Sequence, residues 1–420
     1  LVMIAVILRR RLAPPTALAW LTIVAFVPVV GLVAYLLIGD AWLGQRRAQM
    51  HQQTIERLRE QDREHRDPDQ QHRGQPAYRT RPDVDADKMP LVREAEKVCG
   101  LPILAGNHVE FLEDTQPTVD RLVADIDAAE HHVHLLFYIY EPDAVGTRVT
   151  AALERAVSRG VAVRLMADAA GSRSLFAYTG PAAAMREAGI EVVPALPVKP
   201  FRRRLARMDI RNHRKLAVID GRTAYTGSHN IVEAHYHKRA GQWVDLNARL
   251  TGPVVRQMQM VFAEDWAYET QTDLEGPSIF PELEPAGDVL AQTVPTGPGE
   301  ITDAFQRIVL SAINAARDHL MLTTPYFVPD EATMLSLMMA ADRGAKVELV
   351  LPRHSDHPLV SAAGRASFER LLENGIHIYE FHEGLLHAKT LSVDDDFAML
   401  GSGNMDIRSF SLNFEMSILL

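Results

Sequence analysis

The stretch that decides the fold is HRKLAVIDGRTAYTGSHN, residues 213–230. Its pattern returns at residues 387–404 as HAKTLSVDDDFAMLGSGN. Both copies read His-x-Lys, four residues, Asp, six residues, Gly-Ser-x-Asn. A single His-x-Lys is usually a solvated strand face. Two copies with the same internal spacing indicate a duplicated functional motif.

Each motif predicts two short strands. LAVID and TLSVD are mainly apolar or alternate, and TAYTG and FAMLG follow them as second strands. Side chains two apart on a strand share a face, so the His and the Lys of each copy should point the same way. If the two copies pack face to face, their pocket holds imidazoles, ammonium groups, hydroxyls and amides. Such a set of donors and cations predicts a site for a tetrahedral oxyanion, most plausibly a phosphate.

The rest of the catalytic part repeats one order of elements: strand, helix, Gly turn, strand, helix, Gly turn, strand. This order predicts right-handed βαβ crossovers and a mainly parallel sheet. We therefore expect an α/β fold made of two βαβ-rich halves. The matched segments are 131–143 with 318–330, 151–168 with 336–352, and 185–193 with 371–379.

The two motifs resemble the paired HKD motifs of the phospholipase D superfamily. The longer runs, RNHRKLAVIDG with TAYTGSHN and HAKTLSVDD with GSGNMDIRSFSLNFE, resemble bacterial cardiolipin synthases, from about residue 17 to residue 420. This resemblance implies a duplicated phospholipase D-like fold with the active site at the interface of its halves. It also implies a membrane phosphatidyltransferase that makes cardiolipin and glycerol from two phosphatidylglycerol molecules.

The resemblance implies a role for each motif residue. One histidine attacks phosphorus and forms a phosphohistidine, and the other protonates the leaving alcohol and then deprotonates the incoming one. By family precedent His213 is the nucleophile and His387 the acid and base, although the residues alone do not order them. The lysines would neutralise phosphoryl oxygens, and the serines and asparagines would donate to them. The expected catalytic residues are His213, Lys215, Asp220, His387, Lys389 and Asp394, and the expected substrate-binding residues are Ser228, Asn230, Asp245, Ser402, Asn404 and Glu415.

The carboxylates have two different expected roles. Asp245, in GQWVDL, and Glu415, in LNFEM, match the downstream carboxylates of the family and would orient the two histidines. An ordinary surface carboxylate is the alternative for each. Asp220 and Asp394, within the motifs, are expected to brace the hairpins rather than touch substrate.

The N-terminal segment is apolar. Residues 17–38, ALAWLTIVAFVPVVGLVAYLLI, are 22 residues without a charge, which predicts a membrane-spanning helix. A signal peptide and a buried globular helix are the alternatives. Residues 1–8 are also apolar and are interpreted as the end of an earlier spanning helix. The expected location is the bacterial inner membrane, as an integral protein, with phosphatidylglycerol and other anionic phospholipids as partners.

Composition along the chain gives the expected boundaries. Residues 1–40 are the transmembrane part, 41–100 a polar linker or helix, 101–270 the first half and 271–420 the second half, interpreted as lacking its last elements. Residues 197–212, PVKPFRRRLARMDIRN, contain six basic side chains and one acidic one. This stretch is expected to be either a solvated loop or an element that touches anionic headgroups beside the site.

Charge and composition argue against several classes of partner. The formal net charge of −10 argues against nucleic acid, because nucleic-acid binders usually present a basic surface. The only cysteine, Cys99, leaves no internal disulfide and is expected to be buried filler. No metal or other cofactor is expected, because two lysines supply the charge that a divalent ion would bring. The pairs His131–His132 and His235–His237 have no companion ligands at a fitting spacing and are expected to be surface or packing residues.

Two other functions stay open. With water as the acceptor, the same site would make a phospholipase D-type hydrolase, either a phospholipase or a nuclease. A non-catalytic membrane scaffold is the third possibility, although a scaffold has no need for two intact His-Lys pairs. The sequence fixes neither the oligomeric state nor the side of the membrane on which the catalytic part lies.

Overall fold

The computed structural model describes residues 2–9, 14–39, 53, 82–197, 209–236, 241–298 and 303–420. The core of the Arg-rich stretch, residues 198–208, lies outside the described residues. So do His237 and most of the polar linker expected between residues 41 and 100.

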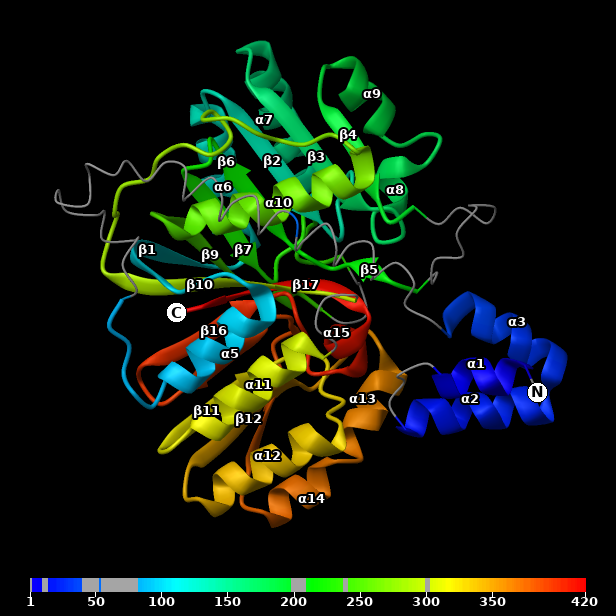
Figure 1. The fold of residues 1–420 in the computed structure, drawn as a ribbon. Coiled ribbons are helices and arrows are strands. Elements are labelled where there is room, and N and C mark those ends of the chain that lie inside the picture. Colours follow the sequence, from blue (N-terminus) through cyan, green and yellow to red (C-terminus); the bar gives the residue numbers. More distant parts are fainter. Residues whose placement is uncertain are drawn as a thin grey trace.

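The first half combines three parallel strands with an antiparallel continuation (Figure 1). β2 (His132–Phe137), β3 (Ala162–Asp168) and β4 (Glu191–Ala195) are parallel, and they are connected by α7 (Ala144–Ser158), then by α8 (Arg173–Phe176) and α9 (Ala182–Glu187). From β2 the sheet continues antiparallel through β6 (Leu216–Ile219), β7 (Thr223–Gly227), β9 (Leu246–Thr251) and β1 (Leu104–Glu113). α6 (Thr115–Ala128) and α7 cover one face of this sheet, and α10 (Val254–Thr270) covers the other.

The second half repeats this order. β11 (His319–Thr323), β12 (Lys346–Pro352) and β13 (His377–Phe381) are parallel, and they are connected by α12 (Glu331–Asp342), then by α13 (Pro358–Arg365) and α14 (Phe368–Glu373). The antiparallel continuation is β15 (Thr390–Val393), β16 (Phe397–Gly401), β17 (Asn413–Leu419) and β10 (Val289–Thr296). The predicted repeat of strands and helices is therefore confirmed. The sheet is mixed rather than mainly parallel, because the motif hairpins and their neighbours add antiparallel strands in each half.

The two halves form one continuous sheet. β1 and β10 pair antiparallel at its centre, with Leu104 opposite Ala291. Two short parallel pairs also cross between the halves: β5 (Arg211–Asn212) with β17, and β14 (Leu385–Leu386) with β8 (Trp243–Val244). One hydrophobic cluster contains side chains of both halves, such as Leu250 and Phe262 with Met416. The halves therefore share a core as well as a sheet.

Helix α5 (Met89–Cys99) precedes the first half in the chain but packs in the core of the second. Leu91, Ala95 and Val98 are buried in the same cluster as α11 (Ala304–Ala315). Cys99 is also buried there, and its thiol donates to the carbonyl of Ala95 at 2.9 Å. The helix lies before the boundary expected at residue 101, and the cysteine is the buried filler that the sequence predicted.

The N-terminal segment forms three short helices, α1 (Val2–Arg9), α2 (Pro14–Phe26) and α3 (Pro28–Ile38) (Figure 1). The single helix expected over residues 17–38 is divided because Pro28 has no amide hydrogen to donate to the preceding turn. α2 and α3 approach closely: a Cβ on Gly31 would lie 2.9 Å from the carbonyl oxygen of Ile23. Among the helices that the structure describes, none has both the length and the apolar character required to cross a bilayer.

Candidate active site

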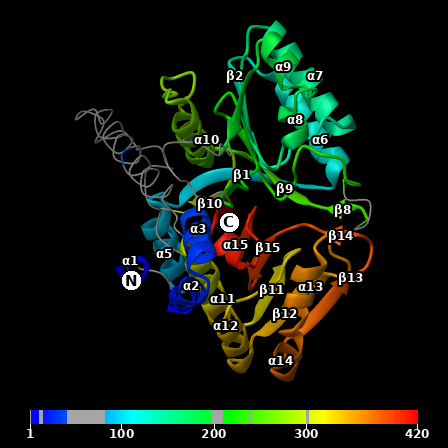
Figure 2. The same ribbon diagram turned by 90° about the vertical axis from the view of Figure 1, so that its right-hand side faces the viewer.

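Both motifs form the hairpins that their sequences predict. β6 and β7 make the first hairpin, and β15 and β16 make the second. The His-x-Lys residues lie just before these hairpins rather than within their first strands, at 213–215 after β5 and at 387–389 after β14. Since β5 pairs with β17 and β14 pairs with β8, each His-x-Lys segment is held against the other half. Figure 2 shows β14 of the second half beside β8 of the first.

Each histidine is hydrogen-bonded to a carboxylate of the other half. Nδ1 of His213 lies 2.9 Å from Oε2 of Glu415, and Nδ1 of His387 lies 2.6 Å from Oδ1 of Asp245. The backbone repeats this crossing, because both histidine amides donate at 2.8 Å to carbonyls of the opposite half. An ionised carboxylate keeps the proton on Nδ1, so Nε2 retains the unshared electron pair. The structure thus brings each of the two expected carboxylates to one histidine.

The motif serines hold the same carboxylates. Oγ of Ser228 donates to Oδ1 of Asp245 at 2.6 Å, and Oγ of Ser402 donates to Oε2 of Glu415 at 2.6 Å. Each hydroxyl also accepts a backbone N–H at 3.0 Å. A hydroxyl has a single hydrogen to donate. In this structure the serines therefore position the carboxylates, and their expected role as donors to phosphate stays a prediction.

Both motif lysines are buried, and each ammonium group turns back to the histidine two residues earlier. Nζ of Lys215 donates to the carbonyl of His213 at 2.6 Å, and Nζ of Lys389 donates to the carbonyl of His387 at 2.5 Å. The two lysines are 1% and 3% exposed. An ammonium group has three hydrogens, so each lysine can still donate to an anion after binding this carbonyl.

The two motif asparagines differ in their contacts. Oδ1 of Asn230 accepts a hydrogen bond from the amide of Ile139 at 3.0 Å. Oδ1 of Asn404 is buried and has no hydrogen-bond partner among the described residues. Its backbone amide donates to Oγ of Ser409 at 2.9 Å. The first asparagine therefore stabilises the end of β2, whereas the second has an unused acceptor beside the site.

The motif aspartates brace the hairpins, as expected from the sequence. Asp220 accepts backbone hydrogen bonds from residues 130–132, and Asp394 accepts them from residues 317–319. Lys88 adds an ion pair with Asp394 at 3.1 Å. Both carboxylates hold the chain where a parallel strand begins. Their expected membership of the catalytic set stays a prediction, because these contacts are structural and involve no substrate.

Two aromatic rings that the sequence analysis did not single out contact the histidines. The ring of Tyr138 meets that of His213 edge to face, with centroids 4.9 Å apart. The ring of Trp243 stacks on that of His387 at 4.2 Å and an interplanar angle of 28°. The sequence could have marked Trp243 as a site residue, because it lies two residues before Asp245. No comparable signal marks Tyr138, which follows β2.

Arg214, the middle residue of the first His-x-Lys, ties the site to its surroundings. Its Nη1 lies 2.8 Å from Oδ1 of Asp265 on α10. Its Nε donates to the carbonyl of Glu415 at 3.0 Å, and its Nη2 donates to that of Thr296 at 3.2 Å. The equivalent residue of the second motif is Ala388, so only the first copy has this brace.

Burial dominates the electrostatics of the basic groups. It lowers the pKa of His213 and, together with the charge of Lys389, lowers the pKa of His387 to about 4. Burial also lowers the pKa of Lys215 to about 7 and that of Lys389 to about 8. Removing a charged group from water disfavours its charged form. Without a bound anion, both histidines are therefore neutral at neutral pH.

The carboxylates respond in the opposite sense. Burial acts to raise the pKa of Asp245 and of Glu415, but the adjacent imidazoles and lysines outweigh it, and the pKa of each carboxyl is lowered. Both therefore stay ionised beside neutral histidines. Before substrate binds, the site therefore contains two lysines and two ionised carboxylates. A bound phosphodiester would add a third negative group.

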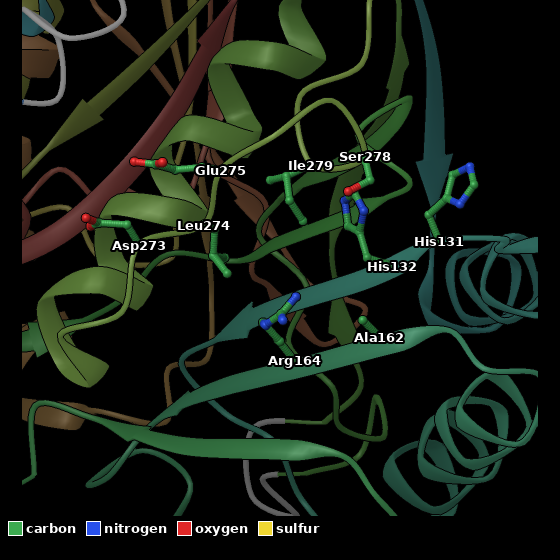
Figure 3. A pocket seen from close by; sticks show the side chains of 9 residues that line it. All are labelled: His131, His132, Ala162, Arg164, Asp273, Leu274, Glu275, Ser278 and Ile279. Atoms are coloured by element: carbon green, nitrogen blue, oxygen red, sulfur yellow. The ribbon is translucent and has the colours of Figure 1, made fainter.

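A separate cavity of about 310 Å³ lies at the opposite edge of the first half, where β2 and β3 begin (Figure 3). His131 and His132 line it, together with Arg164. His132 stacks on His134 with centroids 4.2 Å apart, which agrees with the packing role expected for it. Within the described ranges, no group of three or more His, Cys, Asp or Glu side chains could hold a metal ion.

Comparison with known proteins decides the family. The sequence matches the family described as "Cardiolipin synthase, PLD-like domain" over residues 122–266 and 309–420. The chain belongs to the cardiolipin synthase family of phospholipase D-like proteins. Residues 1–39 match a second family, described as "Phospholipase_D-nuclease N-terminal".

Named cardiolipin synthases are similar over nearly the whole chain. Cardiolipin synthase A of Serratia proteamaculans is 39% identical over 425 residues, which cover 99% of this chain and 85% of the relative. Cardiolipin synthase A of Yersinia pseudotuberculosis has the same identity and coverage. The family that the motifs predicted is therefore confirmed. Both His-x-Lys segments of this chain lie within the residues that match the cardiolipin synthase family.

A solved structure supports the fold. The crystal structure of phosphatidylserine synthase from Haemophilus influenzae aligns with a TM-score of 0.55 and 14% identity, over 78% of this chain and 86% of that one. At this identity the likeness concerns the fold alone. The phospholipase D-like fold expected for the cardiolipin synthase family is confirmed.

Proposed function

We propose that this protein is a membrane phosphatidyltransferase that makes cardiolipin and glycerol from two phosphatidylglycerol molecules through a phosphohistidine. The observation that carries the proposal is the pair of crossed histidine–carboxylate contacts, each beside a buried lysine. Two such pairs supply one nucleophile and one acid–base group for the same phosphorus. Named cardiolipin synthases are 39% identical along the chain.

In the first half-reaction, Nε2 of His213 attacks the phosphorus of the donor phosphatidylglycerol. The bond between phosphorus and the headgroup glycerol oxygen breaks, and protonated His387 gives its Nε2 proton to that oxygen. Free glycerol leaves, and the phosphatidyl group stays on His213. The Nδ1–H of His213 faces an ionised Glu415, which stabilises the positive charge that the attacking imidazole acquires.

In the second half-reaction, a terminal hydroxyl of another phosphatidylglycerol gives its proton to Nε2 of His387. The resulting oxygen attacks phosphorus, the bond between phosphorus and His213 breaks, and cardiolipin leaves. Lys215 and Lys389 neutralise the phosphoryl oxygens in both steps. The phosphodiester energy is kept in the covalent intermediate, so no nucleotide is needed.

The negative charge of the substrate explains how His387 becomes protonated. In the empty site its pKa is about 4, because burial and the adjacent lysines oppose a further positive charge. A phosphodiester adds a negative charge next to the lysines and raises this pKa. The acid is therefore formed when substrate binds.

The proposal places the enzyme in the bacterial inner membrane as an integral protein. Residues 1–40 are the membrane segment, 41–100 the linker with α5 at its end, 101–270 the first half and 271–420 the second. This is supported by large apolar side chains that stand exposed on α2 and α3, including Leu18, Phe26 and Val29, and by the family match of residues 1–39.

Lipid analysis tests the proposal. The full chain is expressed in bacterial cells that lack cardiolipin, and membranes are then supplied with phosphatidylglycerol labelled in its headgroup. We expect cardiolipin and labelled glycerol in equal amounts. Phosphatidic acid with labelled glycerol and no cardiolipin would mean that water is the acceptor, and the protein would then be a phospholipase D-type hydrolase.

A further inference from the structure

Helix α13 has its apolar stripe on the outside. Leu359, Ala362 and Ala363, with Ala366 just after the helix, follow the spacing of one helix face and are exposed, and the Leu359 side chain is 85% exposed. The opposite face packs inward at Gly364, where a Cβ would lie 2.2 Å from the carbonyl oxygen of Phe327. An amphipathic helix on a globular protein normally turns its apolar stripe to the core. Here nothing in the described part of the chain covers that stripe.

Helix α15 (Ile407–Ser411) adds an apolar side chain at the rim of the active site. Its inner face holds the site, because Oγ of Ser409 donates to Oε1 of Glu415 at 2.9 Å. Its outer face carries Ile407, which is 65% exposed. α15 adjoins α13, since Met405, just before α15, forms a bridge with Phe327.

The first half contributes an equivalent position. The connection after β3 contains Tyr178, whose side chain is fully exposed. The same connection packs on the site at Gly171, where a Cβ would lie 2.3 Å from the carbonyl oxygen of Tyr138, and Tyr138 contacts His213. The α13 connection follows β12 in the same way. Both connections therefore leave the same edge of the sheet, the edge that holds the histidines.

Positive charge accompanies these apolar side chains. Arg173, on α8, and Arg408, on α15, are exposed, and Arg408 donates to the carbonyl of Asp209 at 2.7 Å. Asp209 and Arg211 are the described charged residues of the Arg-rich stretch, residues 197–212. Apolar side chains flanked by cations match the chemistry of an anionic bilayer, in which acyl chains lie below negative headgroups.

We propose that the α13 stripe, Ile407 and Tyr178 form one docking surface that rests on an anionic phospholipid bilayer, around the entrance to the active site. The inference rests on the proposed function, because a phospholipid substrate must leave a bilayer to reach the histidines. In Figure 1, α13 and α15 lie toward the right-hand side of the molecule, where the apolar helices α1–α3 also lie. One bilayer can therefore meet both parts of the chain.

The test places a fluorescent probe on the surface of the full chain. Cys99, the only cysteine, is buried, so L359C and I407C can each be labelled with an environment-sensitive dye. L372C is the matched control: Leu372 is 55% exposed on α14, which leads to the start of β13 at the opposite edge. In phosphatidylglycerol vesicles we expect a blue shift and quenching by brominated lipid at positions 359 and 407, and neither effect at 372.

A second measurement concerns turnover. For the double variant L359E with I407E, we expect the ratio of turnover on phosphatidylglycerol vesicles to turnover of a short soluble diester to fall about tenfold. The control L372E should keep the ratio of the natural protein. An equal loss of both activities would make these residues part of the catalytic fold and overturn the proposal.

Three further outcomes decide between occupants. A dye at position 359 that stays in water while the enzyme turns over vesicles overturns the proposal. A blue shift without vesicles also overturns it: dependence on protein concentration would identify a second copy of the chain as the occupant, and independence would identify α1–α3. Failure of the proposed function is separate, because it appears as absence of cardiolipin whatever the dye reports.

Discussion

Glu415, on the last strand of the second half, accepts a hydrogen bond at 2.9 Å from Nδ1 of His213, the histidine of the first half. Asp245 and His387 make the reciprocal contact at 2.6 Å. Each histidine is therefore oriented by the half to which it does not belong. Changing one carboxylate at a time should therefore disturb one histidine at a time. The contributions of the two histidines to the half-reactions can then be measured separately.

The E415Q variant should slow formation of the phosphohistidine, on the order of 10²- to 10⁴-fold, because the amide no longer stabilises a charged His213. D245N should slow proton transfer by His387 in both half-reactions. Rapid-quench measurement of labelled phosphoenzyme distinguishes these cases. E348Q is the matched control, since Glu348 binds His319 at 2.6 Å away from the site. Normal formation of the intermediate by E415Q would show that His213 is not the nucleophile.

Replacement of either histidine by alanine should abolish transfer. H213A removes the nucleophile, and H387A removes the proton donor and acceptor, so each variant lacks a group that the other cannot replace. Groups that act as a unit are not additive, and the double variant should be little worse than either single one. Cardiolipin formation in vesicles measures this. A double variant slower than the singles by the product of their separate effects would contradict a shared reaction cycle.

Binding of an anion to the empty site should take up protons at pH 7. The pKa of Lys215 is about 7 and that of His387 about 4 before binding, and an adjacent phosphate raises both values. Calorimetric titration with dimethyl phosphate, a diester without a titrating proton near pH 7, in two buffers of different ionisation enthalpy gives the number of protons. Uptake should shrink in K215M. Release of protons, or no exchange, would contradict the lowered pKa values.

Lys215 should also make stability depend on pH. Its pKa is lowered from 10.5 to about 7 in the fold, so between these values the unfolded chain binds more protons and the free energy of unfolding rises with pH. K215M removes this penalty and should be more stable than the natural protein near pH 6, by a few kcal/mol at about 1.4 kcal/mol per pKa unit. Thermal melts from pH 6 to pH 10 should show the two proteins converging. A constant difference would contradict the prediction.

Arg214 should act as a positioning residue through Glu415. R214K keeps the charge but loses the fork that reaches Asp265 and the Glu415 carbonyl together. We expect kcat to fall at least tenfold with little change in KM, and the acid limb of the pH profile to move. R249K is the control, because Arg249 pairs with Asp125 away from the histidines at 2.7 Å. A loss of stability in both variants with no change in the pH profile would reduce Arg214 to a structural role.

The spacing within each motif was sufficient to predict the hairpins and the duplicated fold. LAVI and TLSV form β6 and β15, and the Gly-Ser-x-Asn segments end the second strands. Such features are local, because a strand and its turn lie within about twenty residues. The expected helix over residues 17–38 failed at one point, Pro28, where a missing amide hydrogen outweighs the uniform apolarity of the segment.

The sequence could not predict how the halves meet. Asp245 lies 32 residues after His213 in the chain, yet it binds His387, because β14 enters beside β8 rather than beside its own half. The serines show the same limit: their type suggested phosphate donors, but their neighbours are carboxylates. Tyr138 and Trp243 carry no motif, and only the fold brings them to the histidines.

The crossed contacts have a consequence for the ancestry of the chain. A half-length protein with one His-x-Lys and one carboxylate would be incomplete alone, but two copies related by a two-fold axis would complete both sites. The two halves of this single chain are therefore arranged like the two subunits of a homodimer. In such a homodimer every substitution would occur twice. In the joined chain the motif position of Arg214 is taken by Ala388 in the second copy, and Tyr138 contacts one histidine while Trp243 stacks on the other. Two joined copies can differ in sequence, and the two histidines can then take the separate roles proposed for them.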